Sequence, residues 1–218
     1  MSTWVETVEK AVKFTIDNFF ERASGIQYYE KAESLKEMRR YEEAIVFYEK
    51  AIAIENNVYM YWQDFGICFL ELERYQEALW AFENASKIEP YDVSVWTNIA
   101  YSLIALGRYR QALKPNETAV ALEPENHLAW SSYAFCFQQL KRYKEALQAY
   151  QKALDLEPNN PEYWKNVGVC QEESKNYQEA LEAYKKAAEI NPTNPIYQEL
   201  VNVMEQQPNR KTWSLKFW

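Results

Sequence analysis

The sequence contains little of what phosphate-binding enzymes, nucleic-acid-binding proteins and disulfide-stabilised proteins require. Its 218 residues include one histidine, three cysteines and four glycines, and acidic side chains exceed basic ones to give a net charge of −8. Four glycines cannot form a glycine-rich phosphate loop, and a negative chain does not suit the phosphate backbone of nucleic acids. The charge favours basic or neutral partners instead.

Long apolar runs are also missing. No stretch approaches the ~20 apolar residues that a membrane-spanning helix needs. Residues 1–10 carry charges and lack the apolar centre of a secretory signal. We therefore expect a cytoplasmic protein without membrane insertion.

Against these absences stands one strong regularity, a period of 34 residues. Five independent series keep this step, which indicates stacked supersecondary units that share a continuous core. Such arrays mostly bind extended partners. The series are Trp62, Trp96, Trp130, Trp164; Tyr41, Tyr75, Tyr109, Tyr143, Tyr177; Ala44, Ala78, Ala112, Ala146, Ala180; Ala51, Ala85, Ala119, Ala153, Ala187; and Pro90, Pro124, Pro158, Pro192.

One repeat, residues 59–90, has the pattern of two amphipathic helices. In its first half Trp62, Phe65 and Phe69 follow spacings of three and four residues, which place them on one helical face. The second half repeats this periodicity around Phe82, and Pro90 ends it. Each repeat is therefore expected to be a helical hairpin that cannot bury its apolar face without neighbours.

Small residues recur at the same step. Gly66 is predicted to lie where the two helices of its hairpin cross closely. A further series of small side chains, predicted to occupy a tight contact between helices, consists of Ser34, Cys68, Ser102, Cys136 and Cys170. Equivalent atoms of stacked repeats are about 10 Å apart, beyond the reach of a disulfide, and metal-ligand spacing is absent. We predict no disulfide and no metal site.

This pattern resembles the tetratricopeptide repeat. The resemblance implies an all-α fold, a right-handed superhelical α-solenoid of stacked antiparallel helix pairs. It is carried in the fourth repeat by Trp130, Tyr133, Ala134, Phe137, Tyr143, Ala146, Tyr150, Ala153 and Pro158, and in the fifth by Trp164, Val167, Gly168, Gln171, Tyr177, Ala180, Tyr184, Ala187 and Pro192. The scaffold serves many partners, so it does not by itself give a function.

The expected organisation has three parts. Residues 1–24 form an N-terminal capping helix, and residues 195–218 form a C-terminal capping helix followed by an aromatic and basic tail. A lid on the first repeat and a membrane-surface helix are the alternatives for the N-terminal helix, and its mixed polar face favours the lid. Residues 25–194 comprise five repeats, 25–58, 59–92, 93–126, 127–160 and 161–194.

The third repeat departs from the pattern. Pro115 lies inside its second helix, where proline costs roughly 3 kcal/mol. Asn116 replaces the core aromatic found as Tyr48, Phe82 and Tyr150 in other repeats. Either the chain bends here, or neighbouring repeats absorb the change.

A second stripe on the first helices lies opposite the tryptophan face. In tetratricopeptide proteins the first helices line a concave groove, so the resemblance implies that this stripe faces it. An apolar centre inside a rim that includes Glu33, Lys36, Glu162 and Glu172 suits an extended or helical peptide with hydrophobic anchors. Alternatively, some of these residues pack against neighbouring first helices. The predicted binding residues are Met60, Gln63, Ile67, Leu70, Thr97, Asn98, Tyr101, Ile104, Leu128, Ser131, Phe135, Lys165 and Asn166.

The family also binds chaperone tails through a carboxylate clamp of groove Lys, Arg and Asn residues. At the matching positions only Lys165 fits, so the sequence does not predict clamp-type binding. Asn98 and Asn166 are able to hydrogen-bond a peptide backbone.

Catalysis lacks its usual residues. The single histidine, His127, has no evident nucleophile or base beside it, and the pairs Glu42–Glu43 and Glu172–Glu173 stand at positions expected to be solvated. We predict no enzyme activity and no cofactor. Three functions remain: a peptide-binding scaffold or adaptor, an assembly or chaperone-like factor that shields apolar client segments, and a self-associating module.

Self-association would use the tail and Trp80. The tail ends in RKTWSLKFW, basic and aromatic together. It docks on its own chain, docks on a second copy to form a homo-oligomer, or stays disordered. Trp80 stands on the outer face of a second helix, where the other repeats have no aromatic residue. It either anchors an interface or packs under a neighbour.

Overall fold

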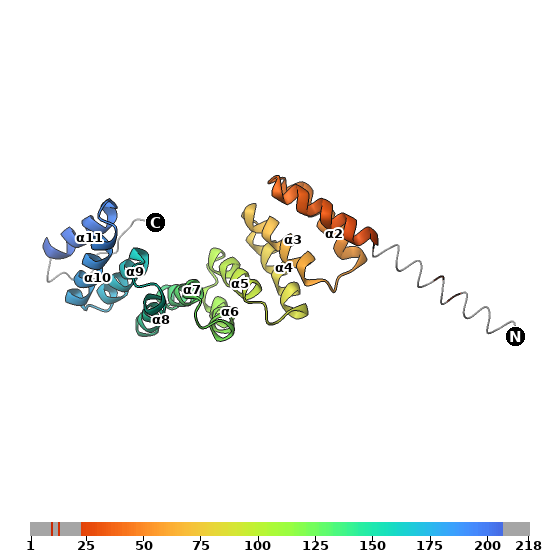
Figure 1. The fold of residues 1–218 in the computed structure, drawn as a ribbon. Coiled ribbons are helices and arrows are strands. Elements are labelled where there is room, and N and C mark those ends of the chain that lie inside the picture. The colour runs from red at the N-terminus through yellow and green to blue at the C-terminus, as the bar shows by residue number, and fades with distance from the viewer. Residues whose placement is uncertain (1–9, 11–12, 14–22, 207–218) are drawn as a thin grey trace. The chain divides into compact units, whose positions relative to one another are not determined.

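The computed structural model describes residues 10, 13 and 23–206. Most of the predicted N-terminal capping helix, residues 1–24, and the whole tail, residues 207–218, lie outside these. All regular secondary structure in the described residues is α-helical (Figure 1), and none of these helices is long and apolar enough to cross a membrane. Residues 23–37 are helical. The later helices are α2 (Tyr41–Ile54), α3 (Tyr59–Glu71), α4 (Tyr75–Ile88), α5 (Val93–Ala105), α6 (Tyr109–Leu122), α7 (His127–Gln139), α8 (Tyr143–Leu156), α9 (Pro161–Glu173), α10 (Tyr177–Ile190) and α11 (Pro195–Gln206).

The chain divides into two compact units, residues 1–106 and residues 107–218. The first unit contains the helix of residues 23–37 and α2 to α5, and the second contains α6 to α11. Within each unit, helices that follow one another along the chain pack together as antiparallel pairs. The fold is therefore the predicted one of stacked helix pairs. The division falls between the two helices of the third repeat.

Each turn from a first to a second helix contains one residue in the left-handed conformation. In the second repeat it is Glu73, with φ 57°, and the following Arg74 N–H reaches back to the Phe69 carbonyl at 2.8 Å. This hydrogen bond satisfies a backbone carbonyl at the end of the first helix. The five left-handed residues are Arg39, Glu73, Gly107, Lys141 and Lys175. Only one of them is glycine, so the sequence did not reveal this feature.

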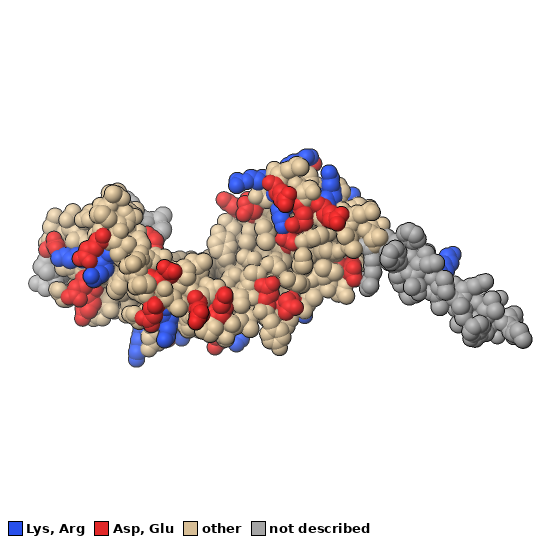
Figure 2. Space-filling view, in the orientation of Figure 1, with Lys and Arg blue, Asp and Glu red and all other residues tan. Residues whose placement is uncertain are grey.

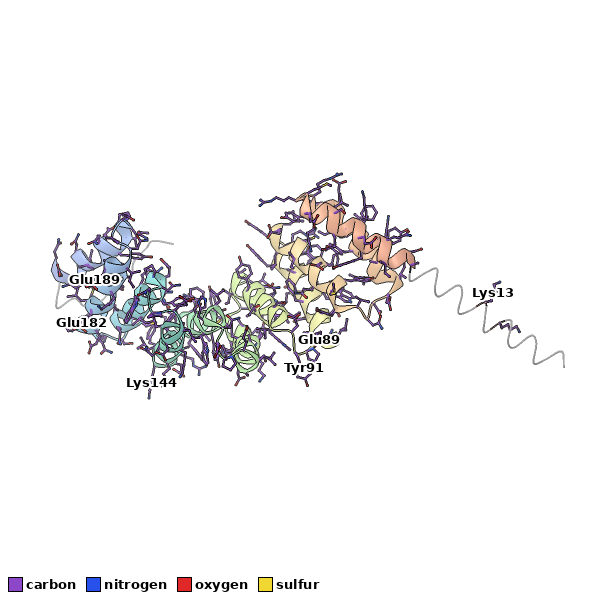
Figure 3. The ribbon with its side chains drawn as sticks, viewed as in Figure 1. Lys13, Glu89, Tyr91, Lys144, Glu182 and Glu189 are labelled. Atoms are coloured by element: carbon purple, nitrogen blue, oxygen red, sulfur yellow. The ribbon has the colours of Figure 1, made fainter. Side chains whose placement is uncertain are left out.

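The tryptophan and proline series are joined by a hydrogen bond that recurs in the turns between repeats. The indole N–H of Trp96 donates to the carbonyl of Pro90, six residues earlier, at 2.7 Å. Trp130 and Trp164 make the same bond to Pro124 and Pro158 at 2.8 Å. Figure 3 labels Glu89 and Tyr91 on either side of Pro90 in such a turn. The indole thus fixes the path of the chain into each new first helix.

Small residues lie where the helices of a hairpin cross, as predicted. A Cβ added to Gly66 would lie 2.7 Å from the ring of Phe82, and one added to Gly168 would collide with Tyr184. Both rings are fully buried. The ring of the second helix therefore occupies the space that a side chain on the first would need.

The cysteines are buried and free, as the spacing predicted. Burial raises the pKa of all three thiols to about 12. Asn116 on α6 lies 3.4 Å from the sulfur of Cys136 on α7, so this site faces the second helix of the preceding repeat. The prediction was wrong for Ser34, which is exposed. Ser34 belongs to the first repeat, and the described residues include no second helix before it.

Helix α6 runs without interruption through Pro115. The adjacent Asn116 is fully buried, and its amide nitrogen donates to the Ala112 carbonyl at 3.0 Å. Its side-chain oxygen has no hydrogen-bond partner among the described residues. The place of a core aromatic is thus taken by a polar group with one unpaired acceptor, which is costly in an interior.

Candidate functional site

Side-chain hydrogen bonds hold the first helices of the first unit side by side. The Gln63 amide on α3 donates to the Ser94 hydroxyl on α5 at 2.7 Å. On the other side of α3, the Tyr29 hydroxyl donates to Asp64 at 2.9 Å, and the Tyr29 ring stacks on Tyr61 with centroids 4.8 Å apart. We call the predicted binding residues of this unit face 1, which comprises Met60, Gln63, Ile67, Leu70, Thr97, Asn98, Tyr101 and Ile104.

Large apolar side chains on face 1 are open to solvent. Met60 is 44% exposed and Tyr101 is 54% exposed. Ile67 and Ile104 are half-buried. The Tyr101 ring is held edge-on against Tyr75, with centroids 6.4 Å apart. Both sequence-based interpretations of this stripe are therefore partly right, because the same face packs between repeats and presents apolar surface.

The polar residues of face 1 are largely committed to the fold. The Thr97 hydroxyl donates to the Ser94 carbonyl at 2.9 Å within its own helix, and the Gln63 amide is bonded to Ser94. Asn98 is half-buried. Apolar contact is therefore what this face mainly offers.

The charged end of the first unit is an internally satisfied cluster. The Lys36 ammonium lies 2.7 Å from Glu33 and 2.6 Å from Asp64, and the buried Tyr48 donates its hydroxyl hydrogen to Glu33. Burial lowers the pKa of Lys36, but hydrogen bonds to the two carboxylates outweigh it and leave that pKa raised. The charge of Lys36 is balanced by these two carboxylates, so Lys36 is not placed to bind the carboxylate of a ligand.

In the second unit, hydrogen bonds likewise connect neighbouring first helices. His127 Nδ1 on α7 lies 2.8 Å from the Tyr163 hydroxyl on α9. Tyr197 on α11 donates its hydroxyl hydrogen to Glu162 on α9. Nothing in the sequence indicated this hydrogen-bond partner of His127, because Tyr163 comes from the next repeat. The predicted residues of this unit form face 2, which comprises Leu128, Ser131, Phe135, Lys165 and Asn166.

Face 2 also presents apolar surface. Leu128 is 63% exposed, and the half-buried Phe135 ring is held edge-on by Tyr109, with centroids 6.0 Å apart. The Ser131 hydroxyl donates to the Leu128 carbonyl at 2.9 Å.

Two exposed residues on α11 were missed. Ile196 is 56% exposed and Val203 is 36% exposed. They stand 34 residues after Glu162 and Val169, so α11 occupies the position of a sixth first helix. Extending the 34-residue period of the first helices by one repeat would have predicted both residues. From here on, face 2 includes Ile196 and Val203.

Two other members of face 2 are engaged within the protein. Lys165 pairs with Glu162 at 2.5 Å, and its side chain is only 15% exposed. Burial raises the pKa of Glu162, but the bonds from Lys165 and Tyr197 outweigh it and leave that pKa lowered. Asn166 is half-buried, and its side chain acts on the pKa of the buried Tyr150 hydroxyl. The charge of Lys165 is thus balanced by Glu162 within the protein.

Glu172 on α9 corrects a further expectation. It was predicted to be solvated, yet it is half-buried and accepts a hydrogen bond from the Tyr184 hydroxyl at 2.7 Å. Burial raises the pKa of Glu172. The period places Tyr184 on the second helix of the same hairpin, where the aromatic ring is buried and the hydroxyl reaches α9.

Trp80 lies on α4 in the first unit. It is 50% exposed and packs edge-on against Trp62, with ring centroids 5.1 Å apart. Half of its surface is thus used in the hairpin core.

Comparisons with known proteins agree with this architecture. Residues 97–161 and 137–195 match the tetratricopeptide repeat model, and residues 37–115 match the model described as anaphase-promoting complex, cyclosome, subunit 3. No curated protein sequence matches the chain significantly.

Solved structures share the fold. YrrB, described as a TPR protein with an unusual peptide-binding site, is 24% identical, with a TM-score of 0.76 over 86% of this chain and 95% of that one. MamA from Desulfovibrio magneticus RS-1 is 22% identical, with a TM-score of 0.74 over 78% of this chain and 97% of that one. The 34-residue period, the stacked helix pairs and the matching family model together identify the chain as a member of the tetratricopeptide repeat family, with about five repeats.

Proposed function

We propose that the chain is a protein-interaction scaffold whose first-helix faces bind a peptide segment of another protein through large apolar anchors. The observation that carries the proposal is the exposure of Met60 and Tyr101 on face 1, and of Leu128, which stands at the repeat position of Met60, on face 2. Soluble proteins rarely gather such side chains on one surface without a partner. The peptide-binding site named for YrrB, which shares the fold, supports the same use of this scaffold.

Each face contains an aromatic ring that a neighbouring tyrosine holds in place, which favours tight binding. Tyr101 and Phe135 are each fixed edge-on by a tyrosine of the preceding second helix. A ring already held in place loses little conformational freedom when a partner binds, so more of the contact energy appears as affinity. Aromatic residues in such settings dominate interface energetics.

The experiment is a selection from a random peptide library displayed on phage, followed by affinity measurements on the enriched peptides. Binding is compared between wild type, a face 1 variant (Met60→Ala with Tyr101→Ala) and a face 2 variant (Leu128→Ala with Phe135→Ala). We expect at least one face variant to weaken binding by about tenfold or more, the scale of a hot-spot truncation.

Val46→Ala serves as the control, because Val46 is 46% exposed on the second helix α2. It should change affinity less than about twofold. Circular dichroism of each variant confirms that the helices are retained. The proposal would be contradicted if the enriched peptides bound all variants equally, or if no peptide were enriched.

A further inference from the structure

Face 2 differs from the rest of its unit in charge. The first helices of this unit, α7, α9 and α11, carry five acidic and one basic side chain, whereas the second helices α6, α8 and α10 carry six of each. Acidic side chains are visible on the surface in Figure 2. The excess negative charge of the unit therefore lies on the helices that bear the exposed apolar residues.

The one basic residue on these first helices does not offset this charge. Lys165 is neutralised by Glu162. Within residues 23–206, no lysine or arginine forms an ion pair with Glu172, Glu173 or Glu199. A ligand with positive charges would find carboxylates without cationic partners here.

Glu172 adds a second argument. It is half-buried between the Tyr184 hydroxyl and the neighbouring Glu173, and burial raises its pKa. A cation bound beside it would favour the ionised form and offset the cost of burial. The face therefore selects for basic ligands at the point where its carboxylate is least solvated.

The tail of this chain has the required chemistry. Residues 207–218 read QPNRKTWSLKFW. They contain three basic residues, no acidic residue and four large apolar residues. The apolar residues match the open surface of Leu128, Ile196 and Val203, and the basic residues match the carboxylates.

The tail also begins in the right place. Helix α11 ends at Gln206, so the tail starts from a helix that contributes to face 2. Twelve residues span at most about 40 Å, whereas packed neighbouring helices are only about 10 Å apart. A tethered segment has an effective concentration near the millimolar range.

We propose that the tail, residues 207–218, binds face 2 of its own chain and competes there with external peptides. This inference rests on the proposed function in that it takes face 2 to be a peptide-binding surface. It adds that the preferred ligand is basic and aromatic, and that the chain supplies one itself.

The experiment measures binding of a fluorescein-labelled synthetic peptide, NRKTWSLKFW, by fluorescence anisotropy. The proteins are the full-length wild type and a full-length tail variant, Trp213→Ala with Phe217→Ala and Trp218→Ala. We expect the tail variant to bind the peptide at least tenfold more tightly than the wild type, because its face is vacated. Equal binding by the two proteins, or binding by neither, would overturn the inference.

Two controls establish the site. Adding Glu173→Lys and Glu199→Lys to the tail variant should weaken peptide binding at least tenfold. Both residues are exposed, and the change removes one long surface hydrogen bond, from the Tyr143 hydroxyl to Glu173, so the fold should be retained. A peptide with glutamate at its basic positions should not bind. Binding that survives both changes would mean nonspecific adhesion and would also overturn the inference.

Sedimentation at increasing concentration tests the intramolecular arrangement. We expect both proteins to stay monomeric. Self-association of the wild type that the tail variant lacks would place the tail on a second copy and overturn binding in the same chain. If library peptides bind face 1 while this peptide fails on face 2, the further inference falls and the proposed function stands.

Discussion

The hydroxyl of Tyr184 donates a hydrogen bond to Glu172 at 2.7 Å, across the crossing of α9 and α10. One repeat earlier, Tyr150 donates in the same way to Gln138 at 2.8 Å. The two repeats thus use an equivalent buried tyrosine to fix a residue of the first helix, once a carboxylate and once a neutral amide. This natural pair allows the charge to be tested separately from the hydrogen bond.

Replacing Glu172 by Gln should stabilise the protein at neutral pH. Burial raises the pKa of Glu172, so between its unfolded and its folded pKa the native state binds the proton more often than the unfolded state. Stability is therefore lost as pH rises through this window and stays reduced above it. Urea denaturation at pH 7 should show the gain, and at a pH below the usual glutamate pKa the gain should vanish.

The reciprocal change, Gln138→Glu, is the control and should destabilise the protein at pH 7. A gain from Glu172→Gln that is equal at both pH values would contradict this account of its origin.

Gly168→Ala should destabilise the protein by about 1 kcal/mol. A Cβ at this position collides with the Tyr184 ring, and overpacking costs about 1–3 kcal/mol. Alanine recovers about 1 kcal/mol through helix propensity, which offsets part of this cost. Thermal and urea unfolding measure the difference. An increase in stability of the size that propensity alone gives would show that the ring moves freely.

Lys141→Gly should stabilise the protein by about 1 kcal/mol. Lys141 is exposed with φ 58°, a conformation that L-residues adopt at a cost of about 1–2 kcal/mol and glycine adopts freely. The matched opposite change is Gly107→Ala, which should destabilise the protein. Gly107 has φ 70° and no atom within 4 Å of an added Cβ, so only backbone strain changes. Urea midpoints that shift in the same direction for both variants would refute the turn assignment.

Asn116→Leu should raise stability by about 1 kcal/mol. Leucine has the same number and branching of side-chain heavy atoms as asparagine. It removes a buried oxygen that lacks a partner, a defect that typically costs about 1–3 kcal/mol. Asn116→Ala removes the same oxygen but leaves a cavity, so it should be less stable than the leucine variant. If leucine destabilises the protein, Asn116 is satisfied by a bound water molecule.

The sequence by itself determined the helix pairs and their core. The period, the tryptophan and proline series and the small residue at Gly66 predicted features that the structure shows, because each depends on helical periodicity and side-chain size. These properties are local to one repeat and are repeated along the chain, so they can be read without knowing how repeats meet.

Only the tertiary structure decided which residues of the predicted stripe are exposed and which are engaged. His127 meets Tyr163 from the next repeat, Lys165 pairs with Glu162, and Glu172 is half-buried under Tyr184. The sequence predicted that such residues share a face, but each partner and each degree of burial depends on how helices cross and which rotamers fit. Periodicity fixes the direction of a side chain from its own helix, and packing between helices decides what it touches.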